Sequence, residues 1–234
     1  MNDSIRAVFF DFDGTLAFHE PDSFDMVSAF CAEIGQPLGP EAERRGRRAE
    51  HRFFAAPDIR DRFKLLAGDD FWLCFNRIML ETMGVEGDLN QLAMRVTDRF
   101  SSLEQEYRCP ETVPLTLAEL RARGYRLGLI TNRQGVERLY ALLDVLLLNS
   151  FFDVRVVAGE LGFRKPEPGI FSAALERAGI TAAQALHVGD NYWADVVGAQ
   201  SSGVKPVLLD PHHIFPEADC LILERVDELL TWLP

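Results

Sequence analysis

Two carboxylates, Asp11 and Asp13, follow directly on the apolar run 7–10 near the start of the chain. Side chains alternate along an extended strand, and a turn at Gly14 lets the chain leave at once, so both acids are expected where a buried strand ends. Carboxylate oxygens in that position can bind a hard cation, and a carboxylate can also act as a nucleophile. The pattern therefore predicts a catalytic metal site at a strand end.

Two other interpretations of this segment fit less well. A hairpin turn would need a second strand immediately after Thr15, whereas residues 17–21 have the composition of a loop. A calcium-binding EF-hand loop also begins Asp-x-Asp, but it needs a third oxygen ligand at the next alternate position and a glutamate at the twelfth. Those positions hold Thr15 and Asp22, so the EF-hand pattern fails.

Three more short motifs follow in the second half of the chain. Each stands where a strand is expected to end or a helix to begin, and they are Thr131-Asn132, Lys165-Pro166 and Gly189-Asp190 followed by Asp195. Together with Asp-Phe-Asp-Gly-Thr-Leu at 11–16, and in this order, they resemble the four signatures of the haloacid dehalogenase-like hydrolase superfamily. The resemblance is close over 5–16 and 110–234, and covers 17–109 only as an insertion of the expected kind.

The predicted elements change character along the chain. Residues 5–10 form a first strand, and helices without an intervening strand are expected at 22–35, 40–55, 58–83 and 88–106. Helices are then expected at 114–123, 134–148, 167–178, 192–201 and 225–232, alternating with strands at 125–131, 154–158, 185–189, 204–209 and 220–223. This alternation predicts an α/β fold, a doubly wound, mainly parallel sheet with helices on both faces. Ligands bind such sheets at the carboxyl ends of the strands, where Asp11, Thr131 and Asp190 fall.

The helical block lies between the first strand and the rest of the sheet. The resemblance implies a Rossmann-like core domain of residues 1–16 and 110–234 with an inserted α-helical cap domain, residues 17–109. Residues 17–21 and 109–114 would then be the hinges. The alternative is a separate helical domain with a role in protein interaction.

The resemblance also implies catalytic roles. Asp11 would be the nucleophile that forms an aspartyl-phosphate, and as a carboxylate it is expected to be ionised at neutral pH. Asp13 would protonate the leaving oxygen and then activate water. Lys165 would neutralise charge in the transition state, and it is one of only three lysines in the chain.

The implied cofactor is Mg²⁺, a cation that prefers oxygen ligands. Asp11 and Asp190 would bind it through their carboxylates and Asp13 through its backbone carbonyl. Asp195 is the fourth candidate for the metal site, and it would hold Lys165 or a metal-bound water. Its alternative role is to offset the dipole at the start of a helix.

Substrate contacts are expected from both parts of the chain. Thr131 would offer its hydroxyl and Asn132 its backbone N–H to the phosphate oxygens, with Thr15 close by. His19, three residues beyond Leu16, is the candidate contact from the insertion. Arg44, Arg48 and Arg52 recur every four residues and could recruit an acidic substrate, but a solvated face paired with nearby glutamates is favoured.

Composition limits the classes of function. The chain has 234 residues, 47% hydrophobic and 26% charged, which is enough for a large core. A net charge of −12 argues against nucleic acid as a partner. Four scattered cysteines indicate buried thiols and no disulfide or zinc framework, and the start of the chain lacks the apolar core of a signal peptide. No apolar run is long enough for a membrane span, so a cytoplasmic protein is expected. It is expected to be a monomer or a homodimer.

The sequence thus predicts a Mg²⁺-dependent phosphatase acting on a small phosphorylated metabolite. A phosphomutase of the same superfamily is the first alternative. A 2-haloacid dehalogenase is the second, although it would not need the acid at Asp13 because a halide leaves without protonation. A catalytically silent binding module is the third, and the complete set of motif residues argues against it.

Overall fold

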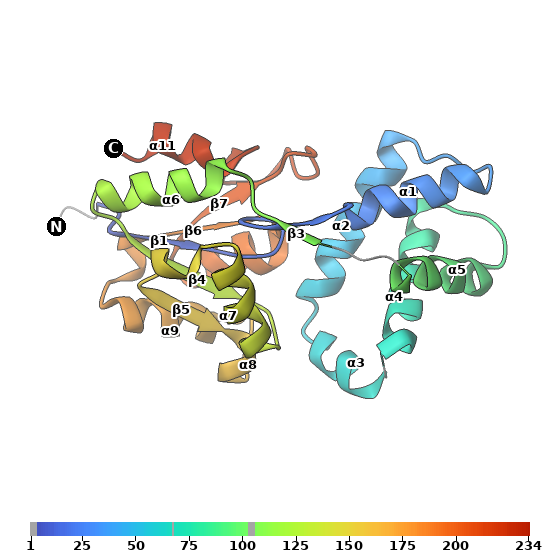
Figure 1. Ribbon diagram of the computed structural model, residues 1–234, viewed down its shortest axis with the longest axis horizontal. Helices are drawn as coiled ribbons and strands as arrows, with labels where there is room; N and C mark the ends of the chain where they lie inside the picture. Colours follow the sequence, from blue (N-terminus) through green and yellow to red (C-terminus); the bar gives the residue numbers. More distant parts are fainter. Residues whose placement is uncertain (1–3, 67, 103–105) are drawn as a thin grey trace. The chain divides into compact units, whose positions relative to one another are not determined.

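The computed structural model describes residues 4–66, 68–102 and 106–234, and the chain divides into two compact units (Figure 1). Residues 1–18 and 108–234 form one unit, called here the α/β unit, and residues 19–107 form the other, called the helical unit. The predicted site residues from Asp11 to Thr15 and from Thr131 to Asp195 all belong to the α/β unit, and His19 belongs to the helical unit.

A six-stranded sheet forms the centre of the α/β unit, and every strand pairing in it is parallel. Its strands lie in the order β5 (Val154–Val157), β4 (Arg126–Thr131), β1 (Ala7–Phe10), β6 (Ala185–Gly189), β7 (Lys205–Leu209) and β8 (Leu221–Leu223). All four residues of β1 are buried, as is usual for a central strand covered on both faces. The predicted α/β fold with a mainly parallel sheet is confirmed.

Helices cover both faces of this sheet (Figure 1). On one face α6 (Thr112–Ala122) packs against α11 (Leu229–Trp232), and on the other α9 (Pro168–Ala178) packs against α10 (Gly198–Ser201). The remaining helices are α7 (Val136–Val145) and the short α8 (Ala158–Leu161). Phe9, Ile130 and Val156 of the sheet meet Ile170 and Phe171 of α9 in one buried cluster. The apolar strands and the apolar helix faces therefore build the core that fixes the strand ends.

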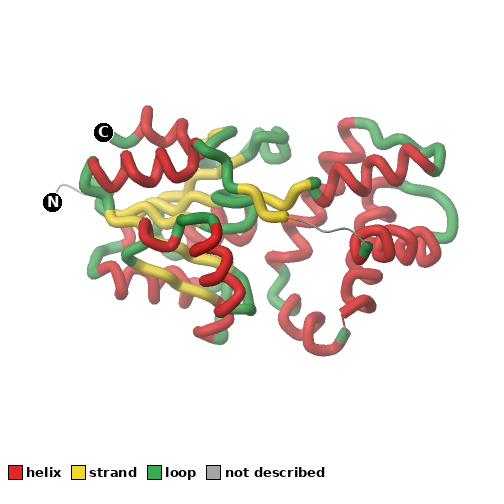
Figure 2. The backbone as a smooth tube through the Cα atoms, viewed as in Figure 1, coloured by secondary structure: helices red, strands yellow, loops and turns green. Residues whose placement is uncertain are grey.

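The helical unit contains α1 (Ser23–Glu33), α2 (Pro40–Ala55), α3 (Ile59–Leu65), α4 (Gly68–Met83) and α5 (Leu89–Ser101) (Figure 2). α4 packs against both α2 and α5. Phe30, Met79, Leu80 and Val96 belong to its main buried cluster. The unit thus has a core of its own.

Several expected elements differ from the structure. The single helix predicted over 58–83 is two helices, because Leu66 adopts an extended backbone that ends α3. The helix predicted to reach residue 106 ends at Ser101, and Glu106–Arg108 is a strand, β3. It pairs with β2 (Phe18–Glu20), which lies in the segment 17–21 that was predicted to be a loop. Both strands are three residues long, too short for a clear alternating pattern. Residues 103–105, also inside that predicted helix, lie outside the described residues.

Two further helices begin irregularly. Residues 192–197 form a π-helical turn before α10, where a regular helix over 192–201 was expected. The Asn191 side chain accepts a hydrogen bond from the Ala194 N–H at 2.9 Å and so caps this turn. π-helical turns are frequent at functional sites, and the turn at 192–197 carries Asp195.

Near the chain end, a 3₁₀ turn at Val226–Glu228 precedes α11.

The four cysteines have free thiols. All four were predicted to be buried, but only Cys31 is, and the other three are half-buried. Among the helices that the structure describes, none combines the length and the apolar character needed to cross a bilayer.

Candidate active site

Asp11 lies at the carboxyl end of the central strand. Its backbone N–H donates to the carbonyl of Val188 at 2.9 Å, which extends the pairing of β1 with β6 by one residue. On the other side β1 pairs with β4, with Phe10 opposite Leu129. Asp11 therefore lies between two strands whose ends carry Thr131 and Asp190, and the carboxyl ends of the three strands form one site.

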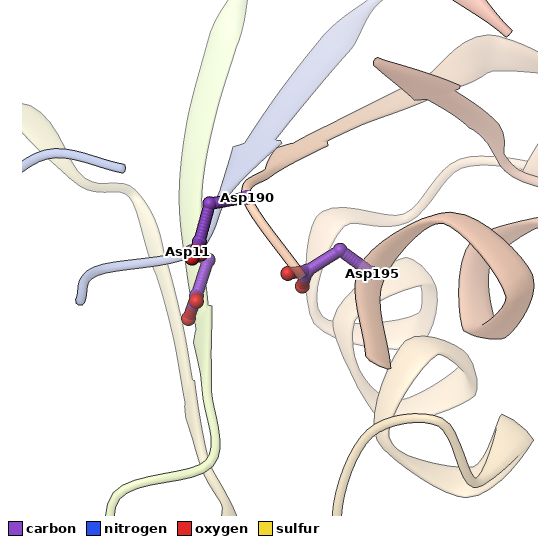
Figure 3. A group of neighbouring side chains, drawn as sticks. All are labelled: Asp11, Asp190 and Asp195. Atoms are coloured by element: carbon purple, nitrogen blue, oxygen red, sulfur yellow. The ribbon is translucent and has the colours of Figure 1, made fainter. Parts of the chain in front are cut away.

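Asp11, Asp190 and Asp195 bring three carboxylates together at this edge (Figure 3). Each can offer one oxygen such that all three atoms lie within 4.8 Å of one another. Gly14 allows the Asp190 side chain to lie close to the backbone of the turn after Asp13, because a Cβ at this position would lie 2.5 Å from Oδ2 of Asp190. Its φ of +74° also belongs to the left-handed region, which other residues rarely adopt.

Lys165 provides a buried cation beside two of these carboxylates. Its side chain is 1% exposed, and Nζ lies 2.7 Å from Oδ1 of Asp11 and 2.6 Å from Oδ1 of Asp195. Burial acts to lower the pKa of Lys165, but attraction from Asp11 and Asp195 raises it overall. The backbone of Lys165 is held by the Asn132 side chain, whose Nδ2 donates to the Lys165 carbonyl at 3.0 Å and whose Oδ1 accepts from its N–H at 2.8 Å.

His187 is a buried partner of Asp195 that the sequence analysis did not identify. Its Nε2 lies 2.8 Å from Oδ1 of Asp195, while Oδ2 of Asp195 accepts the backbone N–H of Asn191 at 3.0 Å. Burial acts to raise the pKa of Asp195, but Lys165 and His187 hold it well below its usual range. Burial lowers the pKa of His187, so the neutral ring donates from Nε2. An ionisable residue in the otherwise apolar strand 185–189 was the available signal.

The surroundings of Asp11 and Asp190 disfavour the ionised forms of both carboxyl groups. Burial raises the pKa of Asp11 to about 7, against the lowering effect of Lys165. Burial and the charges of Asp11 and Asp195 raise the pKa of Asp190 well above its ordinary value. Asp11 was expected to be fully ionised at neutral pH, and with this raised pKa it needs a further cation to be so. A divalent ion fits this site, because it prefers clustered carboxylate oxygens and would favour their ionised forms.

Asp13 is paired with Arg133, the second functional candidate that the sequence analysis missed. Nε of Arg133 donates to Oδ2 of Asp13 at 2.8 Å, and Nη2 donates to Oδ1 at 2.7 Å. The Asp13 side chain is 43% exposed and that of Arg133 16%. The available signal was an arginine directly after the Thr131-Asn132 motif at a strand end.

The remaining predicted residues have identifiable surroundings. The buried Thr15 donates from Oγ1 to Oδ1 of Asp190 at 3.5 Å, and the buried Thr131 accepts the Arg133 N–H through Oγ1 at 3.3 Å. In the helical unit, the ring of His19 packs against Tyr107 with centroids 4.0 Å apart.

The arginine face of α2 is largely solvated. Arg44 and Arg52 are exposed and Arg48 is half-buried. Arg44 pairs with Glu41 at 3.3 Å, one turn away on the same helix.

The chain is similar over most of its length to a sequence profile, to characterised relatives and to a solved structure. Residues 5–203 match the sequence profile described as haloacid dehalogenase-like hydrolase. The chain is 27% identical over 226 residues to a glyceraldehyde 3-phosphate phosphatase of Methanothermobacter thermautotrophicus, covering 92% of this chain and 90% of that protein. It is 31% identical over 237 residues to a phosphoglycolate phosphatase of Pseudomonas savastanoi, covering 98% and 79%. Among solved structures, a 2-haloacid dehalogenase of Pseudomonas syringae superposes with a TM-score of 0.56 at 26% identity, covering 97% of each chain.

Proposed function

Because the chain belongs to the haloacid dehalogenase-like hydrolase family, we propose that it is a Mg²⁺-dependent phosphatase of small phosphomonoesters. The observation that carries this proposal is the group at the end of β1, where Asp11 pairs with Lys165 at 2.7 Å and Asp13 follows two residues later. A nucleophile, a charge-neutralising cation and an acid are the groups that phosphoryl transfer needs. Two relatives named as phosphatases support the same reaction class.

The cation would be held by the carboxylates of Asp11 and Asp190 and by the backbone carbonyl of Asp13. Its chemical contribution is to neutralise charge so that an anionic phosphate can approach an anionic nucleophile. Asp195 has a different part in this proposal, because Lys165, His187 and the Asn191 N–H already occupy its two oxygens. It orients Lys165 toward Asp11.

The reaction then runs in two steps. A carboxylate oxygen of Asp11 forms a bond to phosphorus while the ester P–O bond breaks, and Asp13 gives its proton to the leaving oxygen. In the second step water attacks the phosphorus of the aspartyl-phosphate, Asp13 takes up the proton, and Asp11 is regenerated. Lys165 stabilises the negative charge on the phosphoryl group, helped by the Thr131 hydroxyl and the Asn132 backbone N–H.

The helical unit has a separate part in the proposal. We assign residues 17–109, which contain the helical unit, the role of a cap that excludes bulk water and selects the substrate. This role supports small metabolites as substrates over phosphoproteins. A phosphomutase would use the same chemistry but would return the phosphoryl group to a second hydroxyl.

The similarity to a 2-haloacid dehalogenase makes carbon–halogen cleavage the competing function. Asp13 decides between the two, because a halide leaves without a proton whereas an alkoxide needs one. The chain carries this acid, which favours phosphate esters.

A panel of metabolite phosphates with Mg²⁺, scored by phosphate release, tests the proposal directly. Wild type should release phosphate from some of them, chelator should abolish the release, and Asp11→Asn should lower turnover by several orders of magnitude because an amide cannot form the acyl phosphate. Asp219→Asn, at an exposed position, is the matched control and should retain activity. Chloride release from 2-chloropropionate exceeding any phosphatase activity would instead establish the dehalogenase.

A further inference from the structure

Asp210 is a buried carboxyl group at the active-site edge of the sheet that the proposed reaction does not use. It directly follows β7, beside the strand whose end carries Asp190, and it is 2% exposed. Its Oδ1 accepts the N–H of Ile214 and its Oδ2 accepts the N–H of Phe215, both at 2.7 Å. Burial of a carboxyl group is costly, and these hydrogen bonds offset the cost only while the backbone donors stay in place. The carboxyl group and the loop after β7 therefore hold each other.

The backbone of Asp210 ties this loop to the sheet. Its N–H donates to the carbonyl of Leu223 at 2.8 Å, which continues the pairing of β7 with β8, and its carbonyl accepts the His213 N–H at 3.2 Å. Backbone and side chain together close residues 210–215 into one turn, called here the Asp210 loop. The loop fixes where Phe215 lies relative to the strand ends.

Phe215 supports the π-helical turn at 192–197. Its buried ring stacks on Tyr192, with the centroids 4.9 Å and the planes 18° apart, and it meets the Trp193 ring edge to face at 5.4 Å. Val196, from the same turn, joins Phe215 in one buried cluster. Aromatic pairs prefer defined geometries, and a close-packed interior transmits a displacement to its neighbours. A shift of Phe215 would therefore shift the turn.

The turn carries Asp195, whose position is tightly constrained. A Cβ at Gly189 would lie 2.2 Å from Cγ of Asp195, so this carboxyl group lies directly against the end of β6. Its Oδ1 accepts a hydrogen bond from Nζ of Lys165 at 2.6 Å, and that Nζ lies 2.7 Å from Oδ1 of Asp11. Movement of the turn therefore moves the ammonium group relative to the nucleophile.

We propose that Asp210 is a positioning residue for phosphoryl transfer. By holding Phe215 against the π-helical turn, it fixes the place of Asp195. The ammonium group of Lys165 is thereby kept where it stabilises charge in the transition state. This inference rests on the proposed function and extends the residues that serve it beyond those that touch the substrate. Rates are sensitive to such placement, because a displacement of about 1 Å caused by a remote change can cost about 10²-fold.

Asp210→Asn tests this role with little change of shape. The amide keeps one acceptor oxygen but places an NH₂ group against one of the two backbone N–H donors. With p-nitrophenyl phosphate at saturating Mg²⁺, we expect kcat to fall about 10–100-fold while KM stays within about twofold, because Lys165 acts mainly in the transition state. Asp219→Asn is the matched control: it makes the same substitution at an exposed position and should keep the wild-type constants.

A double-mutant cycle identifies the route by which Asp210 acts. Phe215→Leu removes the ring that stacks on Tyr192, and by itself it should also lower kcat. If Asp210 acts through that ring, the variant with both substitutions should have nearly the kcat of the slower single variant, whereas independent effects would multiply. Thermal melting verifies that each variant is folded at the assay temperature. A role in stability alone would change the melting temperature and leave kcat unchanged.

The outcomes separate this inference from the proposed function. A wild-type kcat for folded Asp210→Asn, or losses that multiply in the double variant, would overturn the inference while phosphatase activity stands. If Asp210→Asn fails to fold, Phe215→Leu decides alone: a lowered kcat supports the inference, and a wild-type kcat overturns it. Absence of Mg²⁺-dependent phosphate release by wild type from p-nitrophenyl phosphate and from every metabolite of the panel would count against the proposed function itself.

Discussion

Nε2 of His187 lies 2.8 Å from Oδ1 of Asp195, the same oxygen that accepts a hydrogen bond from Lys165 at 2.6 Å. The His187 ring is fully buried, and its other nitrogen, Nδ1, has no hydrogen-bond partner in the part of the chain that the structure describes. A buried imidazole with one orphaned nitrogen is costly, so its contact with Asp195 must contribute something that an apolar residue would not. We infer that it fixes the Asp195 carboxylate, which in turn directs Lys165 toward Asp11.

Replacing His187 tests this positioning role. His187→Leu removes the donor and leaves a buried carboxylate oxygen with one partner fewer. We expect a fall of about 1–3 kcal/mol in the free energy of unfolding, measured with urea. We also expect kcat to fall with little change in KM, because Lys165 acts mainly in the transition state. His213→Asn is the control, at an exposed position whose left-handed backbone, with a φ of +51°, asparagine tolerates. Equal kcat values for His187→Leu and wild type would show that His187 only fills space.

The raised pKa of Asp11 predicts how Mg²⁺ binding depends on pH. In the metal-free protein this pKa is raised from the ordinary 3.8 to about 7, chiefly by burial, and that of Asp190 is raised too. Between these values the folded state binds the extra proton, so this group's contribution to stability falls as pH rises through the window. A cation must displace these protons, so its affinity should increase as pH rises through the pKa of Asp11 at about 7.

Thermal melting with and without Mg²⁺ measures this linkage. The increase in melting temperature caused by a fixed Mg²⁺ concentration should be small near about pH 5 and larger near about pH 8. Asp190→Asn removes one proposed ligand and should reduce the increase at both pH values. A Mg²⁺ effect that is the same at both pH values in wild type would contradict the assignment of Asp11 and Asp190 as ligands.

The sequence was sufficient to predict the strand ends but not the contacts between them. Asp11 follows a continuous apolar run, and Asp190 follows one that is interrupted only by His187. Parallel strands place their carboxyl ends at one edge, so the proximity of the two acids follows from pattern and topology. The pairs Asp13–Arg133 and Asp195–His187 depend on side-chain directions, and the first joins residues 120 positions apart. No local pattern contains that information. The break between α3 and α4 was missed for a related reason, since helical periodicity continues across it.

His19 offers a test of substrate selection by the helical unit. If it reaches the substrate, His19→Ala should change KM among metabolite phosphates more than kcat, because such a contact is made in the ground state and transition state alike. Arg44→Ala and Arg52→Ala remove exposed side chains from α2 and should leave both constants within about twofold. Steady-state kinetics on the phosphate panel measures all three. Indistinguishable constants for His19→Ala and wild type would remove His19 from the substrate contacts.

Asp13→Asn tests the acid through the leaving group. An amide cannot supply a proton, so hydrolysis of 2-hydroxyethyl phosphate, whose leaving alkoxide is strongly basic, should slow by about 10²–10⁴-fold. Hydrolysis of p-nitrophenyl phosphate should slow much less, because nitrophenolate leaves with little need for a proton. The oxygen of the amide can still accept a hydrogen bond from Arg133, which limits disturbance of the backbone around residue 13. The decisive quantity is therefore the ratio of the two kcat values in the variant and in wild type. An equal loss on both substrates would mean that Asp13 contributes through position or metal binding, and the proton would then have to come from another group.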